Sequence, residues 1–263
     1  MKISETLKRI LSKCENEINS YQFEDVYSEL KNGKDIATFT EMMLSVDIDP
    51  AKYLGYIPLG YLRDTAVERY SIPDGTTRIE DWAFGGCNRL TSITIPGSVT
   101  NIGSSAFRDC DGLTSATIGN GVTNIGDHAF YYCSGLTSVT IPDSVTRIED
   151  YAFGDCSKLT SVTIPDSVID IRSYAFAYCR GLTSVTVGNG VEIIGCGVFA
   201  HCSGLTSVTI GNGMKNIGNN VFYGCDEMKD IIYRGTVKQW KEIKKREEDF
   251  SEIKIHCSDG DVE

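Results

Sequence analysis

The chain has 263 residues, of which 41% are hydrophobic, and its 36 acidic residues against 25 basic ones leave a formal net charge of −11. Most of the acidic excess falls within residues 71–228. An acidic surface repels phosphate backbones and anionic lipid headgroups, so this balance argues against nucleic acid and membrane surfaces as partners. It favours a basic patch on another protein.

Residues 1–66 carry apolar side chains at the spacing of amphipathic helices. The apolar face of the first helix consists of Ile3, Leu7, Ile10, Leu11 and Ile18. Gly33 ends a second helix, Asp35 can cap a third, and Pro50 suits the first turn of a fourth. We predict a helical N-terminal cap over residues 1–66, with an independent interaction module as the alternative.

The first 20 residues contain charges where a signal peptide needs an unbroken apolar run, and they lack a small-residue cleavage site. Nothing later in the chain reaches the roughly 18 consecutive apolar residues that a membrane span requires. We therefore expect a cytoplasmic protein with no membrane insertion.

An internal repeat of 23 residues follows. Each period contains one cysteine, and these are Cys87, Cys110, Cys133, Cys156, Cys179, Cys202 and Cys225. A phenylalanine precedes each cysteine by three residues, and a leucine or methionine follows each by three. A fixed period over seven turns is typical of a solenoid, in which each coil buries its apolar side chains against its neighbours.

The segment that follows each cysteine alternates between apolar and polar residues. In residues 136–141, Val139 and Ile141 should face the core and Ser138 and Thr140 should face solvent, as in a half-buried strand. Pro-Asp-Ser or Gly-Asn-Gly then turns the chain into a short return leg.

These residues resemble the BspA-like leucine-rich repeats, which are widespread in bacteria. The resemblance covers about residues 71–235 and implies an α+β fold built on a leucine-rich-repeat solenoid of about seven 23-residue coils. Members of the family are commonly surface or secreted proteins that bind other proteins. The resemblance therefore leaves the cell surface open as a location beside the cytoplasm.

A solenoid needs a cover over the apolar cross-section at its end. In the segment 229–263, Thr236 and Gln239 have the spacing of a capping box at the start of a helix. The apolar face of this helix consists of Val237, Trp240 and Ile243. The alternation in IKIHC is typical of a closing edge strand. We predict a solenoid over residues 67–228 and a strand-helix-strand C-terminal cap over 229–263.

We interpret the seven repeat cysteines as small buried hydrophobic residues at a tight corner. Disulfides need an oxidising compartment, and zinc needs four ligands around one point, whereas a ladder of cysteines offers a line. The cysteines outside the ladder, Cys14, Cys196 and Cys257, are the better candidates for reactive thiols. We expect no metal and no other cofactor.

The sequence contains no recognisable catalytic constellation. His128 and His201 occupy different repeat positions more than three coils apart, so they cannot share a site. There is no phosphate-binding glycine loop, no G-x-S-x-G motif and no H-E-x-x-H motif. The outward rows of Ser and Thr resemble the grids of ice-binding solenoids, but ice recognition needs a flat array and these repeats usually curve. We predict that the protein is not an enzyme.

Positions that differ between the copies are free to serve a partner, because identical positions serve the stack. The residue before Ala-Phe and the two residues after Phe vary most, and aromatic residues gather there between positions 128 and 178. The predicted partner-binding residues are His128, Tyr131, Tyr132, Tyr151, Tyr174 and Tyr178. Tyrosine is frequent in protein interfaces, although packing between coils explains Tyr151 and Tyr174 about as well.

The sequence therefore predicts a monomeric, non-catalytic solenoid that binds another protein. An acidic inhibitor is the alternative from a different class, for instance a decoy that occupies the nucleic-acid-binding groove of an enzyme. A net charge of −11 on an elongated body can imitate a phosphate strand. A bacterial surface adhesin is a further alternative.

Overall fold

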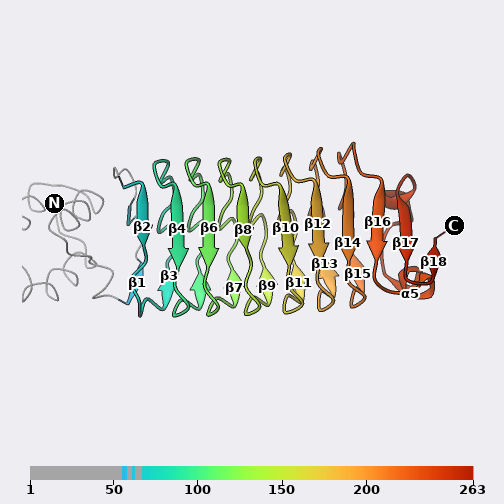
Figure 1. Ribbon diagram of the computed structural model, residues 1–263, viewed down its shortest axis with the longest axis horizontal. Coiled ribbons are helices and arrows are strands. Elements are labelled where there is room, and N and C mark those ends of the chain that lie inside the picture. The colour runs from blue at the N-terminus through green and yellow to red at the C-terminus, as the bar shows by residue number, and fades with distance from the viewer. Residues whose placement is uncertain (1–54, 58–60, 63–66, 263) are drawn as a thin grey trace, which may run out of the picture.

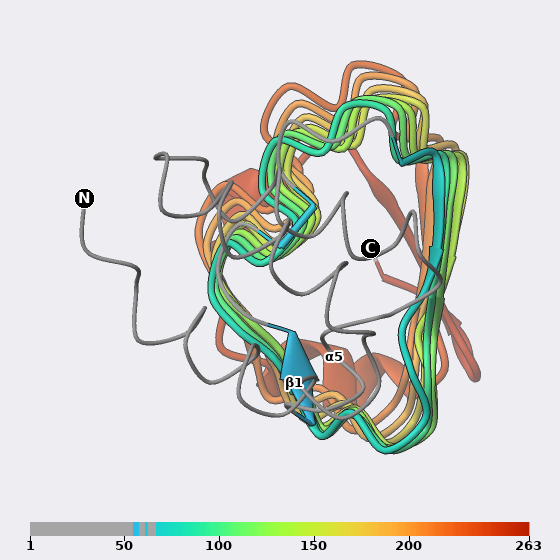
Figure 2. The same ribbon diagram turned by 90° about the vertical axis from the view of Figure 1, so that its left-hand side faces the viewer.

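A computed structural model describes residues 55–57, 61–62 and 67–262, with the side chains at 247 and 248 left out. The described residues wind into an elongated solenoid whose coils lie side by side along the long axis (Figure 1). Viewed along that axis, successive coils superimpose closely (Figure 2). The predicted solenoid is confirmed, and the helices expected before residue 55 lie outside the described residues.

The shorter of the two strands in each coil forms one continuous parallel sheet of eight strands. These strands are β1 (Tyr56–Ile57), β3 (Arg78–Ile79), β5 (Asn101–Ile102), β7 (Asn124–Ile125), β9 (Arg147–Ile148), β11 (Asp170–Ile171), β13 (Ile193–Ile194) and β15 (Asn216–Ile217). Each pairs with its neighbours at equivalent repeat positions, as Ile102 does with Ile125. Strand β1 lies within residues 1–66, which were expected to be helical. It is a strand because its backbone pairs with β3 and completes a first coil.

The longer strands carry the predicted alternation of apolar and polar residues. These strands are β2 (Arg69–Ser71), β4 (Ser92–Ile95), β6 (Ser115–Ile118), β8 (Ser138–Thr140), β10 (Ser161–Ile164), β12 (Ser184–Val187), β14 (Ser207–Ile210) and β16 (Asp230–Tyr233). In β10, for example, Val162 and Ile164 are buried while Ser161 and Thr163 are exposed. The hydroxyl rows therefore face solvent, as the sequence predicts.

These longer strands form two sheets rather than one, because regular pairing stops between β8 and β10. At this break the Thr160 amide nitrogen lies 3.4 Å from the Thr137 carbonyl oxygen, compared with 3.0 Å for the same bond from Thr183 to Thr160. Val139 in β8 is only partly buried. The eight-stranded sheet continues across the same interface, so β9 and β11 still join the two coils there.

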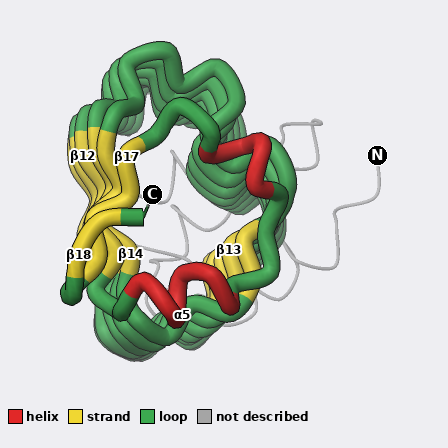
Figure 3. The backbone as a smooth tube through the Cα atoms, turned by 90° about the vertical axis from the view of Figure 1, so that its right-hand side faces the viewer, coloured by secondary structure: helices red, strands yellow, loops and turns green. Residues whose placement is uncertain are grey.

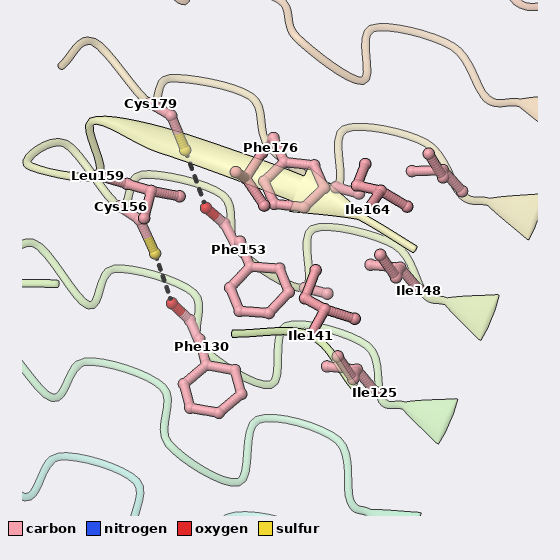
Figure 4. Close-up of a cluster of buried hydrophobic side chains, with 14 of the residues drawn as sticks. Ile125, Phe130, Ile141, Ile148, Phe153, Cys156, Leu159, Ile164, Phe176 and Cys179 are labelled. Carbon is pink, nitrogen blue, oxygen red and sulfur yellow. Dashed lines mark hydrogen bonds between the residues drawn. The ribbon is translucent and has the colours of Figure 1, made fainter. Parts of the chain in front are cut away.

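The interior is a column of phenylalanine rings with a ladder of thiols beside it. Seven rings stack in register from Phe84 to Phe222, with neighbouring centroids between 4.9 and 5.9 Å apart. The six thiols from Cys110 to Cys225 each donate a hydrogen bond to a phenylalanine carbonyl oxygen, as Cys156 does to Phe130 at 3.3 Å (Figure 4). All seven ladder cysteines are buried, which confirms their interpretation as core residues.

The C-terminal segment packs on the last coil and extends its sheet (Figure 3). It consists of α5 (Val237–Glu242), the 3-10 helix η1 (Glu247–Phe250), β17 (Lys254–Cys257) and β18 (Gly260–Asp261). The capping box of Thr236 and Gln239 is present. Trp240 is buried, with its ring centroid 5.4 Å from that of Tyr233 and 5.6 Å from that of Phe250.

Strand β17 pairs in parallel with β16, as expected for a closing strand, but β18 then pairs antiparallel with β17. The edge of the sheet is therefore β18, which the sequence pattern does not indicate. None of the helices in the described part of the chain has the length and hydropathy of a membrane span.

Candidate functional site

Each of the seven coils marked by a repeat cysteine holds two residues with positive φ on one edge of the solenoid, one directly before the Ala-Phe or Val-Phe pair and one directly before the cysteine. Residues other than glycine rarely adopt this conformation. Here bonds between coils fix it, since the Tyr151 amide donates to the Ser173 carbonyl oxygen at 3.1 Å and the Tyr178 amide to that of Ala200 at 2.8 Å. The side chains of these two positions and of the residue after each Phe form a surface that we call the ring edge.

Five of the six predicted binding residues meet in one group on this surface. This group, the ring cluster, consists of His128, Tyr131, Tyr132, Tyr151 and Tyr174. The rings of His128, Tyr151 and Tyr174 stack with centroids 5.0 and 4.9 Å apart. Tyr131 meets His128, Tyr132 and Tyr151 edge-on, at 5.1, 4.6 and 5.7 Å. Such pairs stabilise one another beyond the burial of area, so these rings have defined positions.

The ring cluster remains accessible although it is ordered. Tyr132 keeps 45% of its surface exposed and Tyr174 keeps 36%. Glycines of the following coil make room for two of the rings. A Cβ atom at Gly154 would lie 2.9 Å from the Tyr131 ring, and one at Gly197 would overlap the Tyr174 ring. The stacked row of His128, Tyr151 and Tyr174 therefore ends at Gly197, which packs against the Tyr174 ring and has no side chain of its own.

The sixth predicted residue, Tyr178, belongs to a second group that we call the ring triad, with His201 and Tyr223. Tyr178 and His201 stack at 4.7 Å, and Tyr223 meets His201 edge-on at 5.2 Å. Tyr223 is 63% exposed. Beside the triad lies an open hollow of about 450 Å³ that is also lined by Arg180, Ser203, Gly224 and Asp226.

The ring edge already holds one guanidinium group of the protein itself. Arg108 lies over the rings of Trp82 and Tyr131, 5.3 and 5.2 Å from their centroids. Its Nε atom is 3.4 Å from a carboxylate oxygen of Asp109. Cations are attracted to aromatic faces by the ring quadrupole, so aromatic walls beside a carboxylate suit an arginine side chain.

Burial shifts the pKa of Tyr131, Tyr151 and His128 in the directions that favour their neutral forms. It raises the pKa of Tyr131 to about 12, with a further contribution from the charge of Asp155. Burial and then the neighbouring tyrosines raise the pKa of Tyr151. Burial also lowers the pKa of His128, and the nearby charge of Arg108 adds to this effect. These three rings are thus favoured in their neutral, hydrogen-bonding forms, which suits recognition better than nucleophilic chemistry.

Four aromatic or cationic residues of the ring edge are absent from the predicted set. They are Trp82, Arg108, His201 and Tyr223. All four occupy the same three repeat positions as the predicted residues, but in coils before or after the densest run of aromatic residues. Selecting candidate binding residues by their repeat position, instead of by the local density of aromatic residues, would have included these four.

The described residues contain no group of three His, Cys, Asp or Glu side chains placed to hold a metal ion. Of the cysteines outside the ladder, Cys196 is exposed and Cys257 is partly buried, while Cys14 lies outside the described range.

Comparison with protein families identifies the family to which this repeat architecture belongs. The model of the BspA type leucine rich repeat region matches residues 56–180 and 123–244, with six copies, and so spans more than half of the chain. The chain belongs to the BspA-type leucine-rich repeat family. None of the curated proteins compared with the chain is a significant match.

Two solved structures extend the family comparison. A leucine rich repeat protein of T. pallidum is 32% identical with a TM-score of 0.59, and the match covers 64% of this chain and 80% of that one. A leucine-rich repeat protein from Bacteroides ovatus is 31% identical with a TM-score of 0.53, over 69% of this chain and 53% of that one. This BspA-type chain thus spans about half the length of the B. ovatus protein.

Proposed function

We propose that this BspA-type repeat protein is a non-catalytic scaffold that binds another protein through its ring edge. The observation that carries the proposal is the stacked row of His128, Tyr151 and Tyr174, whose rings are fixed by packing yet remain partly exposed. Rigid aromatic side chains lose little conformational entropy on contact and provide much of the energy of many interfaces.

The variation between coils supports the ring edge over the strand face as the binding surface. The exposed rows of the longer strands repeat Ser and Thr from Ser92 to Thr209, so they present a nearly uniform surface. The ring edge changes in size, charge and hydrogen-bonding groups from coil to coil. A partner that binds in a single register must contact side chains that distinguish one coil from the next.

The repeat itself supplies the variant that tests this proposal. Glycine occupies the left-handed positions of Tyr132 and Tyr174 in other coils, at Gly86 and Gly197. The double variant Tyr132→Gly/Tyr174→Gly therefore removes two rings without straining the backbone. We expect it to weaken binding of a partner, captured from the source cell and then purified, by about 1–3 kcal/mol. Titration calorimetry measures this loss.

The matched control is Thr140→Ala/Thr163→Ala, which alters the exposed strand face. It should change the affinity by less than about 0.5 kcal/mol, and circular dichroism should show that all three proteins are folded at the temperature of the titration. Normal binding by the tyrosine variant together with weak binding by the threonine variant would place the site on the strand face. A steep loss of affinity at high salt would instead support an acidic decoy, because an aromatic interface is less sensitive to ionic strength.

A further inference from the structure

We propose that the hollow beside the ring triad is a subsite for a guanidinium group, which takes an arginine side chain from a basic segment of the partner. This inference rests on the proposed function, since it names the chemistry of the partner at the same ring edge. The lining combines Tyr178, Arg180, His201, Ser203, Tyr223, Gly224 and Asp226.

Aromatic rings form two walls of the hollow. The ring of His201 is held in place by stacking on Tyr178, and a Cβ atom at Gly224 would lie only 2.6 Å from its Nδ1 atom. Tyr223 meets this ring edge-on and is the most exposed aromatic side chain of the edge. Because Tyr178 and Gly224 pack against the His201 ring, the exposed Tyr223 ring is the one on which a planar guanidinium can stack, with its N–H groups free to donate hydrogen bonds in their plane.

The charges at the rim favour a cation. Asp226 is exposed and, within the described part of the chain, forms no ion pair with a basic side chain. Arg180 is the basic residue of the lining, but it lies near Asp155: burial raises the pKa of that carboxyl, and the charge of Arg180 opposes the rise. Arg180, like Asp226, forms no ion pair within the described residues, but the charges of Asp155 and Asp226 near the hollow together exceed its single positive charge.

Arg108 shows a comparable arrangement with its cation in place. Its guanidinium lies over two rings, one of which is Tyr131, and contacts a carboxylate. Four coils later Tyr223 occupies the repeat position of Tyr131, and Ala200 occupies that of Arg108. His201 occupies the repeat position of Asp109, so the carboxylate near the later rings comes from a different repeat position, that of Asp226. The later coils therefore keep an aromatic wall but contribute no cation of their own at the Arg108 position.

The test compares two fluorescent peptides of equal length and charge, one alternating Gly and Arg and the other alternating Gly and Lys. Fluorescence anisotropy with the full-length protein should show about five- to tenfold tighter binding of the arginine peptide. Tyr223→Ala and Asp226→Ser should each weaken that binding by about five- to tenfold. Both variants use residues found at the same repeat positions in other coils, such as Ala177 and Ser203, so the fold should be retained.

Asp111→Ser is the matched control, because Asp111 has the repeat position of Asp226 five coils earlier and the substitution removes the same charge. It should change the affinity by less than about twofold. No binding of the arginine peptide, equal binding of both peptides, or equal losses from Asp111→Ser and Asp226→Ser would overturn the subsite. Those results leave the proposed function standing, since its test uses a captured partner and the rings of Tyr132 and Tyr174, which lie outside the hollow.

Discussion

Gly154 limits where the Tyr131 ring of the preceding coil can lie. A Cβ atom at Gly154 would be 2.9 Å from that ring. Ala177 and Ala200 nevertheless occupy the same repeat position in later coils, where no tyrosine precedes them. The backbone at this position therefore admits alanine, and it is the ring that excludes it from residue 154.

We predict that Gly154→Ala destabilises the protein by about 1 kcal/mol, because the Tyr131 ring must move from its packed position. In a Tyr131→Ala background the same substitution should be neutral or should stabilise by up to about 1 kcal/mol, since alanine restricts the unfolded chain. Denaturant unfolding of the four proteins of this double-mutant cycle measures the coupling. An equal cost in both backgrounds would contradict the contact between these two residues.

The positions of the six candidate residues followed from the repeat, but their contacts did not. Whether Tyr151 stacks on His128 or turns into solvent depends on the left-handed backbone that holds both residues, which residue type alone does not indicate. The site of Arg108 was missed for a related reason. Its rings come from the preceding and the following coil, so no local stretch of sequence contains both walls. The role of these residues in binding stays a prediction.

At the scale of the elements, one histidine joins three strands near the C-terminus. The Nε2 atom of His256 in β17 lies 3.0 Å from Asp230 Oδ1 in β16, and its Nδ1 atom lies 2.9 Å from Asp261 Oδ1 in β18. A neutral imidazole donates from one nitrogen only, whereas an imidazolium donates from both. These hydrogen bonds, first to Asp230 and then to Asp261, raise the pKa of His256.

The raised pKa predicts a dependence of stability on pH. Because the pKa is higher in the folded protein than in the unfolded chain, the stabilisation is fully present below the unfolded value near 6.5 and is lost as pH rises through the folded value. The difference in unfolding free energy between the wild type and His256→Gln should therefore be larger at pH 5.5 than at pH 8.5. A difference that stays constant with pH would show that the two carboxylates do not favour the imidazolium.

Local patterns predicted the strands and the capped helix but not every pairing between strands. Thr236 and Gln239 satisfy each other's backbone groups within one turn, so their spacing was sufficient to predict the start of the helix. Strand β18 pairs only because β17 offers it a free edge, and its two residues carry no alternating pattern. The break between β8 and β10 also lacks a local signal, since both segments have the same Ser-Val-Thr-Ile sequence.

At the scale of the whole molecule, the described solenoid begins before the first cysteine-marked period. Ile57, Tyr61 and Leu62 are at most 1% exposed. The Tyr61 ring lies 5.7 Å from Tyr70 and 6.4 Å from Phe84, so it covers the N-terminal end of the phenylalanine column.

Two truncated proteins should separate the role of this first coil from that of the preceding residues. Deletion of residues 1–66 removes β1 and Tyr61 and leaves the Phe84 end of the core exposed, so we expect a lower melting temperature and self-association. Deletion of 1–54 retains those residues and should cause less of both effects. Calorimetry and light scattering measure the two properties, and identical behaviour of the two proteins would contradict a covering role for the first coil.

We predict that the break between β8 and β10 weakens the cooperativity of folding between the coils on its two sides. In a solenoid each interface contributes a nearest-neighbour coupling to folding, and this interface has lost one of its two ladders. Native-state hydrogen exchange should therefore show faster opening at Thr160 than at Thr183. Tyr151 and Tyr174 stack across the same interface. A partner that binds both rings would strengthen the weakest coupling between coils. Hydrogen exchange at the Thr160 amide would then become slower, so this amide would report binding that takes place on the opposite face of the coil.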